Sequence, residues 1–537
     1  MADCLPFRST GYFSDLILDY IEKKPALTSF YNRFPSIENF EHQIKEKHNT
    51  YNHSVRTVLV EVLNHQYSPL ATSEATQFHI NALQEQHTFT VTTGHQLNLF
   101  TGPLYFLYKI VSTINLAKQL KEKYPEHTFV PVYWMATEDH DFEEINYFNF
   151  KQQKIEWSRD ASGAVGHLST LGLEQISQAL EKEFGKSEHA KYLKRLFKVA
   201  YLEHDTLASA TQFLANALFG AHGLVVLDAD DARLKAKFST HIKNDLLYHT
   251  AYQQTEKQAN QLAKLSYSIQ VNPREINLFY MHEGIRERLV KQGDTYQVLN
   301  TEPQFSEPEI LALVDEHPER FSPNVVMRPL YQEVILPNLA YIGGGGELAY
   351  WLELKALFEA EMITFPILML RNSVVLYSDK TSKKLKKLET SIEDLFLSPS
   401  ELENKQTRKN SNLNIDFESQ KKTLEHQFQD LYTIAQNTDP SFYSAVAAQE
   451  KKQKKGLEHL EHRLLKAQKR KLKDENERVL KLQDSLFPKQ ALQERMLNFS
   501  EIYIDYGDQL FQDLLEELDP FQTKFLCLEL PIYTTKN

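Results

Sequence analysis

A stretch of about 50 residues near the start of the chain constrains the fold most, because it reads as strand, helix and strand. Residues 88–93 (TFTVTT) form a β-branched and aromatic run, and residues 129–136 (FVPVYWMA) form a second apolar run of strand length. Between them, residues 103–124 have helical periodicity, with Thr101 placed to cap the helix and Pro103 suited to its first turn. Such a unit predicts a parallel sheet covered by helices on both faces.

The same alternation of helix and strand recurs in separate segments farther along the chain. A helix at 207–222 precedes the apolar strand 224–227 (LVVL), and a helix at 347–361 precedes the strand 365–370 (FPILML). The second interruption of this pattern contains short alternating runs broken by glycine turns, which is typical of a small antiparallel meander. We therefore predict an α/β fold with a doubly wound parallel sheet and two insertions.

The chain divides into eight expected segments. They are an N-terminal helical segment (1–86), a first core segment (87–145), insertion 1 (146–204), a second core segment (205–239), insertion 2 with the meander (240–320), a third core segment (321–380), a helical coiled-coil domain (381–500) and a C-terminal segment that returns to the core (501–537).

Composition excludes several classes of protein. Hydrophobic residues make up 42% and aromatic residues 11% of the 537 residues, so the chain has enough apolar material to fold. Only Cys4 and Cys527 are present, which rules out a disulfide framework and a cysteine-rich metal site. The net charge of −12 disfavours nucleic acid as a partner. Without a membrane-length apolar run or a signal-like N-terminus, we expect a cytoplasmic protein with no membrane partner.

Leucine spacing in the last third of the chain indicates a coiled coil of imperfect register. Leu457, Leu460 and Leu464 follow one heptad phase, whereas Leu465, Leu472, Val479, Leu482 and Leu486 follow another. Pro440 lies where an antiparallel hairpin with arms at 416–436 and 441–487 would turn. The second arm is basic. This charge fits a solvated helix face, and it leaves an arm that grips RNA or DNA and pairing between subunits as alternatives.

Three polar loops follow predicted strands, where open parallel sheets bind their ligands. In the first loop, Gly94 permits a tight exit, and the next helix offers backbone N–H groups that suit a phosphate or carboxylate. Lys109 lies one helical turn after Tyr105 and can reach an anion bound there. The alternative is that the polar side chains only satisfy the loop's own backbone. The candidate binding residues of this loop are Gly94, His95, Gln96, Asn98, Thr101, Gly102, Tyr105 and Lys109.

The second loop is strongly acidic and follows Trp134, which is a further candidate binding residue. It contains the candidate catalytic residues Glu138, Asp139, His140 and Asp141, which join His95 of the first loop. Clustered carboxylates repel one another, so a cation is expected beside them: a substrate amine, a divalent ion or an arginine such as Arg328. An acidic helix start explains only a portion of the run. A carboxylate or histidine here can act as a base toward an attacking amine.

The third loop contains four of the 17 glycines in one run. Such a run lets the backbone approach a ligand closely, although a tight turn is the alternative and the spacing matches neither a P-loop nor a dinucleotide fingerprint. Arg328 is placed to clamp a carboxylate. The candidate residues of this region are Asn324, Arg328, Gln332, Gly343, Gly344, Gly345, Gly346, Glu347 and Tyr350. Asp228, Asp230 and Asp231 end a strand, where helix capping is their expected use.

Taken in order, the three loops resemble one family. Three segments are similar to motifs of the BshC family of bacillithiol synthesis, whose members are cysteine-adding ligases. The segments are TTGHQLNLFTGPLYFLYK, VPVYWMATEDHDFEEIN and FSPNVVMRPLYQEVILPNLAYIGGGGELAYW. The resemblance implies a Rossmann-type core like that of class I aminoacyl-tRNA synthetases and nucleotidylyltransferases, two connecting insertions, and a coiled coil that makes a homodimer. It also implies amide formation between cysteine and the amino group of glucosaminyl-malate, the last step to bacillithiol.

The motif positions carried over from the family are Gly94, His95, Gln96, Thr101, Gly102, Pro103, Lys109, Glu138, Asp139, His140, Asp141, Asn324, Arg328, Gly343, Gly344 and Glu347. The chain departs from the family at Asn98, Gly345 and Leu370, where relatives often have glycine, proline and proline. These departures concern backbone detail.

The implied chemistry requires an activated cysteine carboxyl group, for which a synthetase-like core suggests adenylation and ATP or ADP as the cofactor, with no metal site expected. Lys109 and Arg328 are our expected partners of the malyl carboxylates, and the acidic loop is expected to receive the sugar ammonium. A candidate second nucleotide site comprises Arg371, Ser373, Tyr377, Tyr506 and Gly507. Two other interpretations stay open: a metal-dependent hydrolase that uses the acidic loop, and a non-catalytic scaffold built on the coiled coil.

Overall fold

The fold is described from a computed structural model, which describes residues 2–531. The chain forms two compact units: the first comprises residues 1–375 and 493–537, and the second comprises residues 376–492. The division therefore falls a few residues earlier at both ends than the expected 380/381 and 500/501. No helix among the described residues is both long and apolar enough to cross a bilayer.

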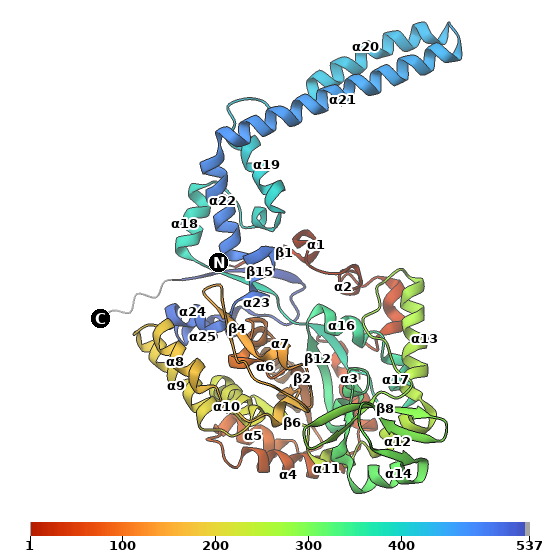
Figure 1. Cartoon of the computed structure of the whole chain (residues 1–537), viewed down its shortest axis with the longest axis vertical. Coiled ribbons are helices and arrows are strands. Elements are labelled where there is room, and N and C mark those ends of the chain that lie inside the picture. The colour runs from red at the N-terminus through yellow and green to blue at the C-terminus, as the bar shows by residue number, and fades with distance from the viewer. Residues whose placement is uncertain (1, 532–537) are drawn as a thin grey trace. The chain divides into compact units, whose positions relative to one another are not determined.

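A five-stranded parallel sheet forms the centre of the first unit (Figure 1). Its order is β13-β12-β2-β3-β6, and every neighbouring pair is parallel. The expected α/β class with a doubly wound sheet is therefore confirmed. The strands are β2 (Thr88–His95), β3 (Thr128–Met135), β6 (Val225–Asp228), β12 (Asn338–Gly343) and β13 (Ile367–Leu370).

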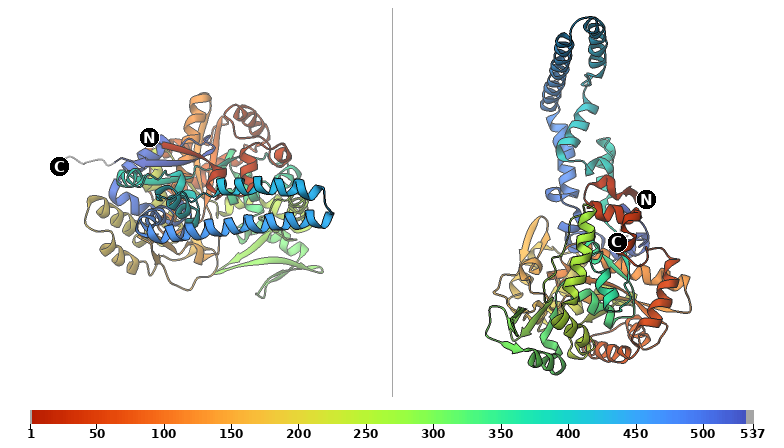
Figure 2. Two further views of the ribbon diagram at one scale, coloured as in Figure 1. Left: turned by 90° about the horizontal axis from the view of Figure 1, so that it is seen from above. Right: turned by 90° about the vertical axis from the view of Figure 1, so that its right-hand side faces the viewer.

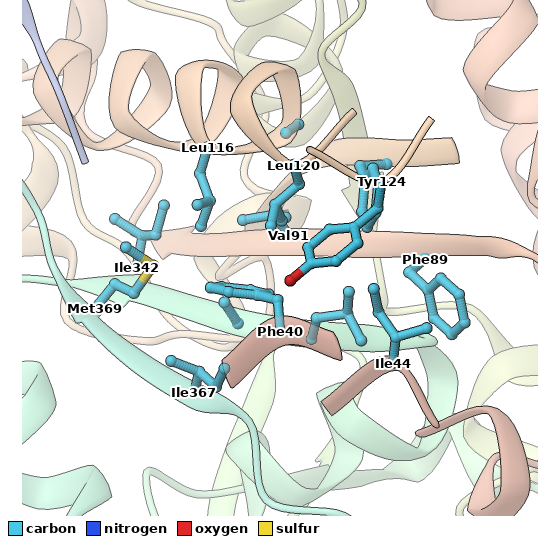
Figure 3. Close-up of a cluster of buried hydrophobic side chains, with 14 residues drawn as sticks. Phe40, Ile44, Phe89, Val91, Leu116, Leu120, Tyr124, Ile342, Ile367 and Met369 are labelled. Atoms are coloured by element: carbon cyan, nitrogen blue, oxygen red, sulfur yellow. The ribbon is translucent and has the colours of Figure 1, made fainter. Parts of the chain in front are cut away.

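Helices cover this sheet because its strands are buried on both faces. In β2, every residue is buried. Phe40 and Ile44 of one helix and Leu116 and Leu120 of another meet strand side chains such as Val91 in one cluster (Figure 3). Fully burying each such side chain contributes roughly 1.5–3 kcal/mol. These two helices are α3 (Asn39–Thr50) and α6 (Tyr105–Lys123).

Other helices of the first unit precede or connect the core strands. They are α1 (Phe7–Thr10), α2 (Asp15–Ile21), α4 (Val55–Tyr67), α5 (Glu74–Ala82), α10 (Leu207–Phe219), α11 (Ala232–Ala236), α15 (Met327–Ile335), α16 (Gly345–Trp351) and α17 (Lys355–Ala360). The N-terminal segment is not wholly helical, because β1 (Ala2–Pro6) pairs antiparallel with β15 (Lys524–Leu530). Because β1 has only five residues and pairs with a segment far away in the sequence, no local sequence pattern predicts this strand.

The short helix α7 (Phe142–Ile145) leads into insertion 1, which contains a hairpin and helices. They are β4 (Tyr147–Phe150), β5 (Gln153–Glu156), the 3-10 turn η3 (Val165–His167), α8 (Glu174–Glu183) and α9 (Glu188–Leu202).

Insertion 2 contains an antiparallel sheet of order β10-β9-β8-β7-β11, in which β7 to β10 form a meander. The Glu309 carboxylate accepts from the Ser306 N–H at 2.7 Å at the start of α14. The elements are α12 (Ser239–Tyr248), α13 (Thr250–Lys264), β7 (Leu278–His282), β8 (Ile285–Gln292), β9 (Thr295–Val298), β10 (Gln304–Ser306), α14 (Glu307–Glu316) and β11 (Phe321–Pro323).

The chain returns to the first unit after residue 492 through α23 (Gln493–Met496), α24 (Phe499–Tyr506), α25 (Gln509–Glu517) and β15. The Leu497 carbonyl accepts from the Leu104 N–H at 2.8 Å, so this segment caps α6. The expected cap by Thr101 is wrong: Thr101 lies in the 3-10 turn η2 (Leu99–Thr101), and no side chain caps α6.

The second unit is helical, and its two long helices lie side by side in Figure 1 and Figure 2. Phe428, Ala435 and Val446 form their buried seam, and the turn falls just before Pro440 as expected. Lysines of the basic arm pair within the unit, for example Lys454 with Glu425 at 2.9 Å and Lys469 with Glu403 at 2.6 Å. The helices are α18 (Asp379–Lys387), α19 (Pro399–Asn410), α20 (Glu418–Gln436), α21 (Pro440–Lys471) and α22 (Lys473–Leu486), and β14 (Val374–Ser378) lies where the units join in sequence.

Candidate functional site

The order of the central sheet locates the site. Successive crossovers run outward from β2 through β3 to β6, and then the chain returns to the other side of β2 to form β12 and β13. The connections therefore reverse between β2 and β12. In open parallel sheets, ligands bind in the crevice at the carboxyl ends of such a pair of strands.

A cavity of about 820 Å³ opens at this point. Residues from all three predicted loops line it, so segments far apart in sequence converge as expected. The predicted site residues in its lining are Gly94, His95, Gln96, Tyr105, Lys109, Trp134, Glu138, Asp139, Asn324, Arg328, Gly344, Gly346, Glu347, Tyr350 and Arg371.

An ion pair joins the first and third loops. Lys109 Nζ lies 2.6 Å from Glu347 Oε2 and donates to the Gly94 carbonyl at 2.7 Å. Glu347 also accepts from the Tyr341 hydroxyl at 2.7 Å and from the Gly344 N–H at 2.9 Å. Burial opposes ionisation of Glu347, but Lys109 and these donors hold its pKa below the usual value. The carboxylate thus orders both loops.

Arg328 points its guanidinium at neutral partners. It donates to Gln332 Oε1 at 3.0 Å, contacts the Tyr350 hydroxyl at 3.5 Å, and lies 5.7 Å from the Tyr341 ring. Among the described residues no carboxylate lies within ion-pair distance of it. A Cβ at Gly94 would lie 3.7 Å from this guanidinium and 3.1 Å from the Tyr341 hydroxyl, which explains the glycine. Arg328 is therefore available to an anionic ligand.

Arg371 brings the returning C-terminal segment to the cavity. Its guanidinium donates to Glu494 at 2.7 Å, and the other carboxylate oxygen of Glu494 accepts from the Val374 N–H at 3.0 Å. The Arg371 Nε is buried without a hydrogen-bond partner among the described residues. Arg495, next to Glu494, also lines the cavity. The cavity wall is thus cationic on this side.

His95 is neutral in this environment. Its ring is buried between Tyr105 and Phe106, with centroid distances of 5.4 and 5.0 Å. Burial, and then the charges of Lys109 and Arg371, hold the pKa of His95 well below the usual value. Within the described chain its Nε2 has no hydrogen-bond partner. A neutral imidazole can accept a proton or donate a hydrogen bond, but it supplies no positive charge.

Two cations that the sequence did not single out compensate the acidic loop. Lys235 Nζ lies 2.7 Å from Glu138 Oε1, and Arg286 of β8 contacts His140 Nδ1 at 2.5 Å. Gln96 donates to Asp139 at 2.9 Å, which links the first and second loops. Arg328, one of the three cations considered for this position, does not pair with the loop, because its partners are Gln332, Tyr350 and the Tyr341 ring.

The geometry of the acidic loop argues against a metal centre. Asp139, His140 and Asp141 have ligand atoms within 4.8 Å of one another, but His140 and Asp141 are exposed. The Arg286 guanidinium occupies the Nδ1 side of His140, and Glu138 turns to Lys235. A cation that already contacts the histidine opposes a second one.

Several predicted residues support the fold. Asn324 does so while it lines the cavity, because its side-chain oxygen accepts from the Val326 and Met327 N–H groups at the start of α15. Gln332 is fully buried beneath Arg328. Gly102 has a φ of 63°, and a Cβ there would lie 2.6 Å from the Cβ of Asn98. Outside the cavity lining lie Asn98, Thr101, Gly102, His140, Asp141, Gln332, Gly343 and Gly345.

The residues of the candidate second nucleotide site have different surroundings. Arg371 lines the main cavity and donates to Ser373 Oγ at 3.2 Å. A Cβ at Gly507 would lie 2.4 Å from His189 Nε2, so that glycine packs on α9, and Tyr506 immediately precedes it. Tyr377 belongs to the second unit.

Sequence reasoning missed other residues of the lining. Tyr341 lies two residues before the glycine run and offered a signal, since it belongs to the strand that leads into this run. Arg286 and Arg495 lie in segments that were assigned to a meander and to helices, and no local pattern marks them. The missed lining residues that carry charge or a hydroxyl are Thr137, Glu144, Arg286, Tyr341 and Arg495.

The fold and site define an α/β protein with a polar ligand pocket at the switch point of a Rossmann-type sheet. Two family descriptions match the chain: "Bacillithiol biosynthesis BshC, N-terminal Rossmann-like domain" over residues 1–372, and "Bacillithiol biosynthesis BshC, C-terminal coiled-coil domain" over residues 374–530. The chain therefore belongs to the BshC family of bacillithiol biosynthesis.

Curated relatives named "Putative cysteine ligase BshC" match almost the whole chain. The protein of Christiangramia forsetii is 56% identical over 98% of this chain and 98% of its own. That of Flavobacterium psychrophilum is 55% identical over 98% and 99%, and that of Cytophaga hutchinsonii is 38% identical over 96% and 97%. A solved structure titled "putative arginyl t-RNA synthetase" from Campylobacter jejuni aligns at 12% identity over 82% of this chain and 98% of its own, with a TM-score of 0.21, which is too low to carry an argument.

Proposed function

We propose that this protein is a cysteine ligase that joins the carboxyl group of L-cysteine to the amino group of glucosaminyl-malate, the last step of bacillithiol biosynthesis. The observation that carries the proposal is that one cavity has both cationic and acidic side chains in its lining. Arg328, Arg371 and Lys109 line it, and so do the carboxylates Glu138 and Asp139 of the acidic loop. Glucosaminyl-malate has two carboxylates and one ammonium, which match these two kinds of side chain. The names of the relatives support the same reaction class.

Arg328 is the first partner we propose for the malyl carboxylates. Its guanidinium has neutral hydrogen-bond partners, so a bidentate carboxylate adds a charge-assisted pair at little cost. Lys109 contributes positive potential, although Glu347 and the Gly94 carbonyl already use two of its hydrogens. The sugar ammonium then lies toward Glu138 and Asp139, and these carboxylates favour its binding and accept its proton.

The cysteine carboxylate must be activated before an amine can displace its oxygen. We propose ATP as the cofactor and an acyl-adenylate as the activated form. His95, with a free Nε2 beside Lys109 and Arg371, hydrogen bonds to the developing negative charge on phosphate or acyl oxygen. The Arg371 Nε offers a further buried donor.

The test is a purified-enzyme assay with cysteine, glucosaminyl-malate, ATP and Mg²⁺, in which mass spectrometry follows the thiol product and AMP. We expect equal amounts of bacillithiol and AMP. Arg328→Met is expected to raise the KM for glucosaminyl-malate at least tenfold, because a bidentate carboxylate contact is lost. The matched control is Arg288→Met, outside this cavity. Formation of ADP would refute the adenylate, and Arg328→Met with unaltered kinetics would refute the binding mode.

We further propose that the active form is a homodimer joined through the second unit. Leu431, Ile434, Phe442 and Tyr443 are exposed apolar side chains near the turn between α20 and α21. Apolar side chains grouped on one helical hairpin are typical of an interface.

A further inference from the structure

Glu138 is the first of four ionisable side chains that contact one another in series and lead out of the main cavity. Lys235 Nζ lies 2.7 Å from Glu138 Oε1 and 2.5 Å from Asp230 Oδ1. The other oxygen of Asp230 lies 2.6 Å from His167 Nε2. Asp230 and His167 line a second cavity, of about 630 Å³, which is different from the one that Glu138 lines. This series of side chains therefore connects two cavities.

Burial along this chain leaves only its ends accessible. The side chains of Lys235 and Asp230 are 1% and 5% exposed, and that of Glu138 is 13% exposed at the main cavity. The His167 side chain is 63% exposed at the second cavity. Lys235 Nζ also donates to the Glu319 carbonyl at 3.0 Å. A buried charge cluster of this kind costs desolvation energy that packing alone does not require.

The backbone is shaped to bring His167 to this place. Gly166 N–H donates to the Thr137 carbonyl at 2.9 Å, and Val165 N–H donates to the Asp139 carbonyl. A Cβ at Gly166 would lie 2.2 Å from Thr137 Cγ2, so only glycine allows η3 to lie against the exit of β3. The acidic loop and the histidine are thus held by direct contact between their backbones.

We propose that Glu138, Lys235, Asp230 and His167 form a proton path that carries a proton from the substrate amine to solvent in the second cavity. This inference rests on the proposed ligase function. In that reaction the bound ammonium loses one proton to Glu138, and the freed electron pair forms the C–N bond as the acyl C–O bond breaks. The leaving phosphate oxygen keeps the electron pair of that bond and takes the second proton of the nitrogen.

The proton on Glu138 then moves by linked transfers. Lys235 accepts it while passing one of its own protons to Asp230, and Asp230 passes a proton to Nε2 of His167. The imidazolium releases its Nδ1 proton to water, and exchange with solvent then moves the remaining ring proton from Nε2 back to Nδ1, so every group returns to its starting charge and the ring to its starting tautomer. Glu138 is the catalytic base in this scheme, and the other three residues act through it.

The surroundings of His167 suit the last position in the path. Its hydrogen bond to Asp230 raises the pKa of His167, while burial and Lys235 oppose this. Burial also raises the pKa of Glu138, although Lys235 opposes it. The other titratable and charged groups near His167 are Arg159, Asp228, His282, Glu283, Glu319 and Arg320.

The first test uses the full-length enzyme under turnover conditions. We expect His167→Ala to lower kcat at least tenfold, because proton transfer by a positioned group contributes on the order of 10²–10⁴-fold. Added imidazole should restore kcat with saturation. The control is His241→Gln, since His241 forms an equally short pair with Glu361, also 2.6 Å, beside α17. It should keep the original kcat and show no response to imidazole. An unchanged kcat in His167→Ala, or a loss that imidazole does not restore, would overturn the path.

The second test needs no turnover. NMR titration of His167, assigned with the His167→Gln variant, should show that its pKa falls in Glu138→Gln, because the path transmits the lost negative charge. An unchanged titration would overturn the linkage. If the proposed ligase function is wrong, the results differ: the unaltered enzyme makes no bacillithiol, while the pKa of His167 still falls in Glu138→Gln.

Discussion

The ammonium of Lys109 lies 2.6 Å from Oε2 of Glu347, so α6, which follows the first core strand, is tied to the glycine turn after β12. Lys109 is almost fully buried, and burial holds its pKa below the usual value, although Glu347 opposes this. The pair fixes the distance between the two loops that flank the switch point. The shape of the cavity therefore depends on it.

Lys109→Met should leave Glu347 in a mostly buried position without its cation. We expect the free energy of unfolding to fall by about 3 kcal/mol, as for other broken buried pairs. Urea denaturation measures this change. Lys109→Met combined with Glu347→Gln should recover some of the loss, since no unpaired charge remains. A double variant less stable than Lys109→Met alone would contradict the pairing.

Arg286→Met should impair the acidic loop without unfolding the protein. Arg286 is the cation nearest His140 and packs 3.9 Å from the centroid of the Phe279 ring. Its loss removes positive charge beside Asp139 and Asp141, so we expect bacillithiol production to fall at least tenfold. The readout is the bacillithiol content of cells that carry only the variant gene. Arg288→Met, two residues along β8, is the matched control and should behave like the unaltered protein.

Asp245 should make stability depend on pH. Burial raises its pKa from the ordinary 3.8 to about 7, although the Asn277 N–H, which donates to it at 2.6 Å, opposes this. A raised pKa in the folded state gives stability that is complete below about pH 4 and is lost as pH rises through 7. We expect the unaltered protein to lose about 1–3 kcal/mol between pH 5 and 8 relative to Asp245→Asn. If the free energies of unfolding of the two proteins change equally with pH, the raised pKa of Asp245 is excluded.

Dimerisation through the second unit predicts that Ile434→Glu with Phe442→Glu produces a monomer. Two carboxylates placed among apolar side chains oppose burial of that surface. Sedimentation measures the mass, and Gln429→Glu on the exposed face of α20 should leave the dimer unchanged. Deletion of residues 412–490 should also give a monomer. A dimer that persists after that deletion would assign the interface elsewhere.

Periodicity was sufficient to predict the core because the strands and helices there are long and strongly patterned. Val91 and Phe129 lie in continuous apolar runs, and the order of strands and helices determines a parallel sheet. The pairing of β1 with β15 was not predictable, since it joins the two ends of the chain. The cap of α6 was missed for the same reason, because its acceptor is the distant carbonyl of Leu497.

The candidate site was predictable where loops follow strands directly. Gly94, Glu138 and Gly344 meet at one cavity because the carboxyl ends of parallel strands share an edge. Charge partners were not predictable in the same way. Arg286 comes from a meander whose position over the sheet depends on tertiary packing, and Lys235 follows an aspartate run that resembled a plain helix cap.

The contacts of Leu497 and Glu494 with residues near 104 and 371 have a consequence for how the protein is made. Because the ribosome must first synthesise the long helical hairpin, the wall of the cavity cannot close until almost the entire polypeptide has emerged. A nascent chain that stalls within the hairpin carries every predicted loop and still has no finished pocket, so unfinished copies are unable to consume substrate.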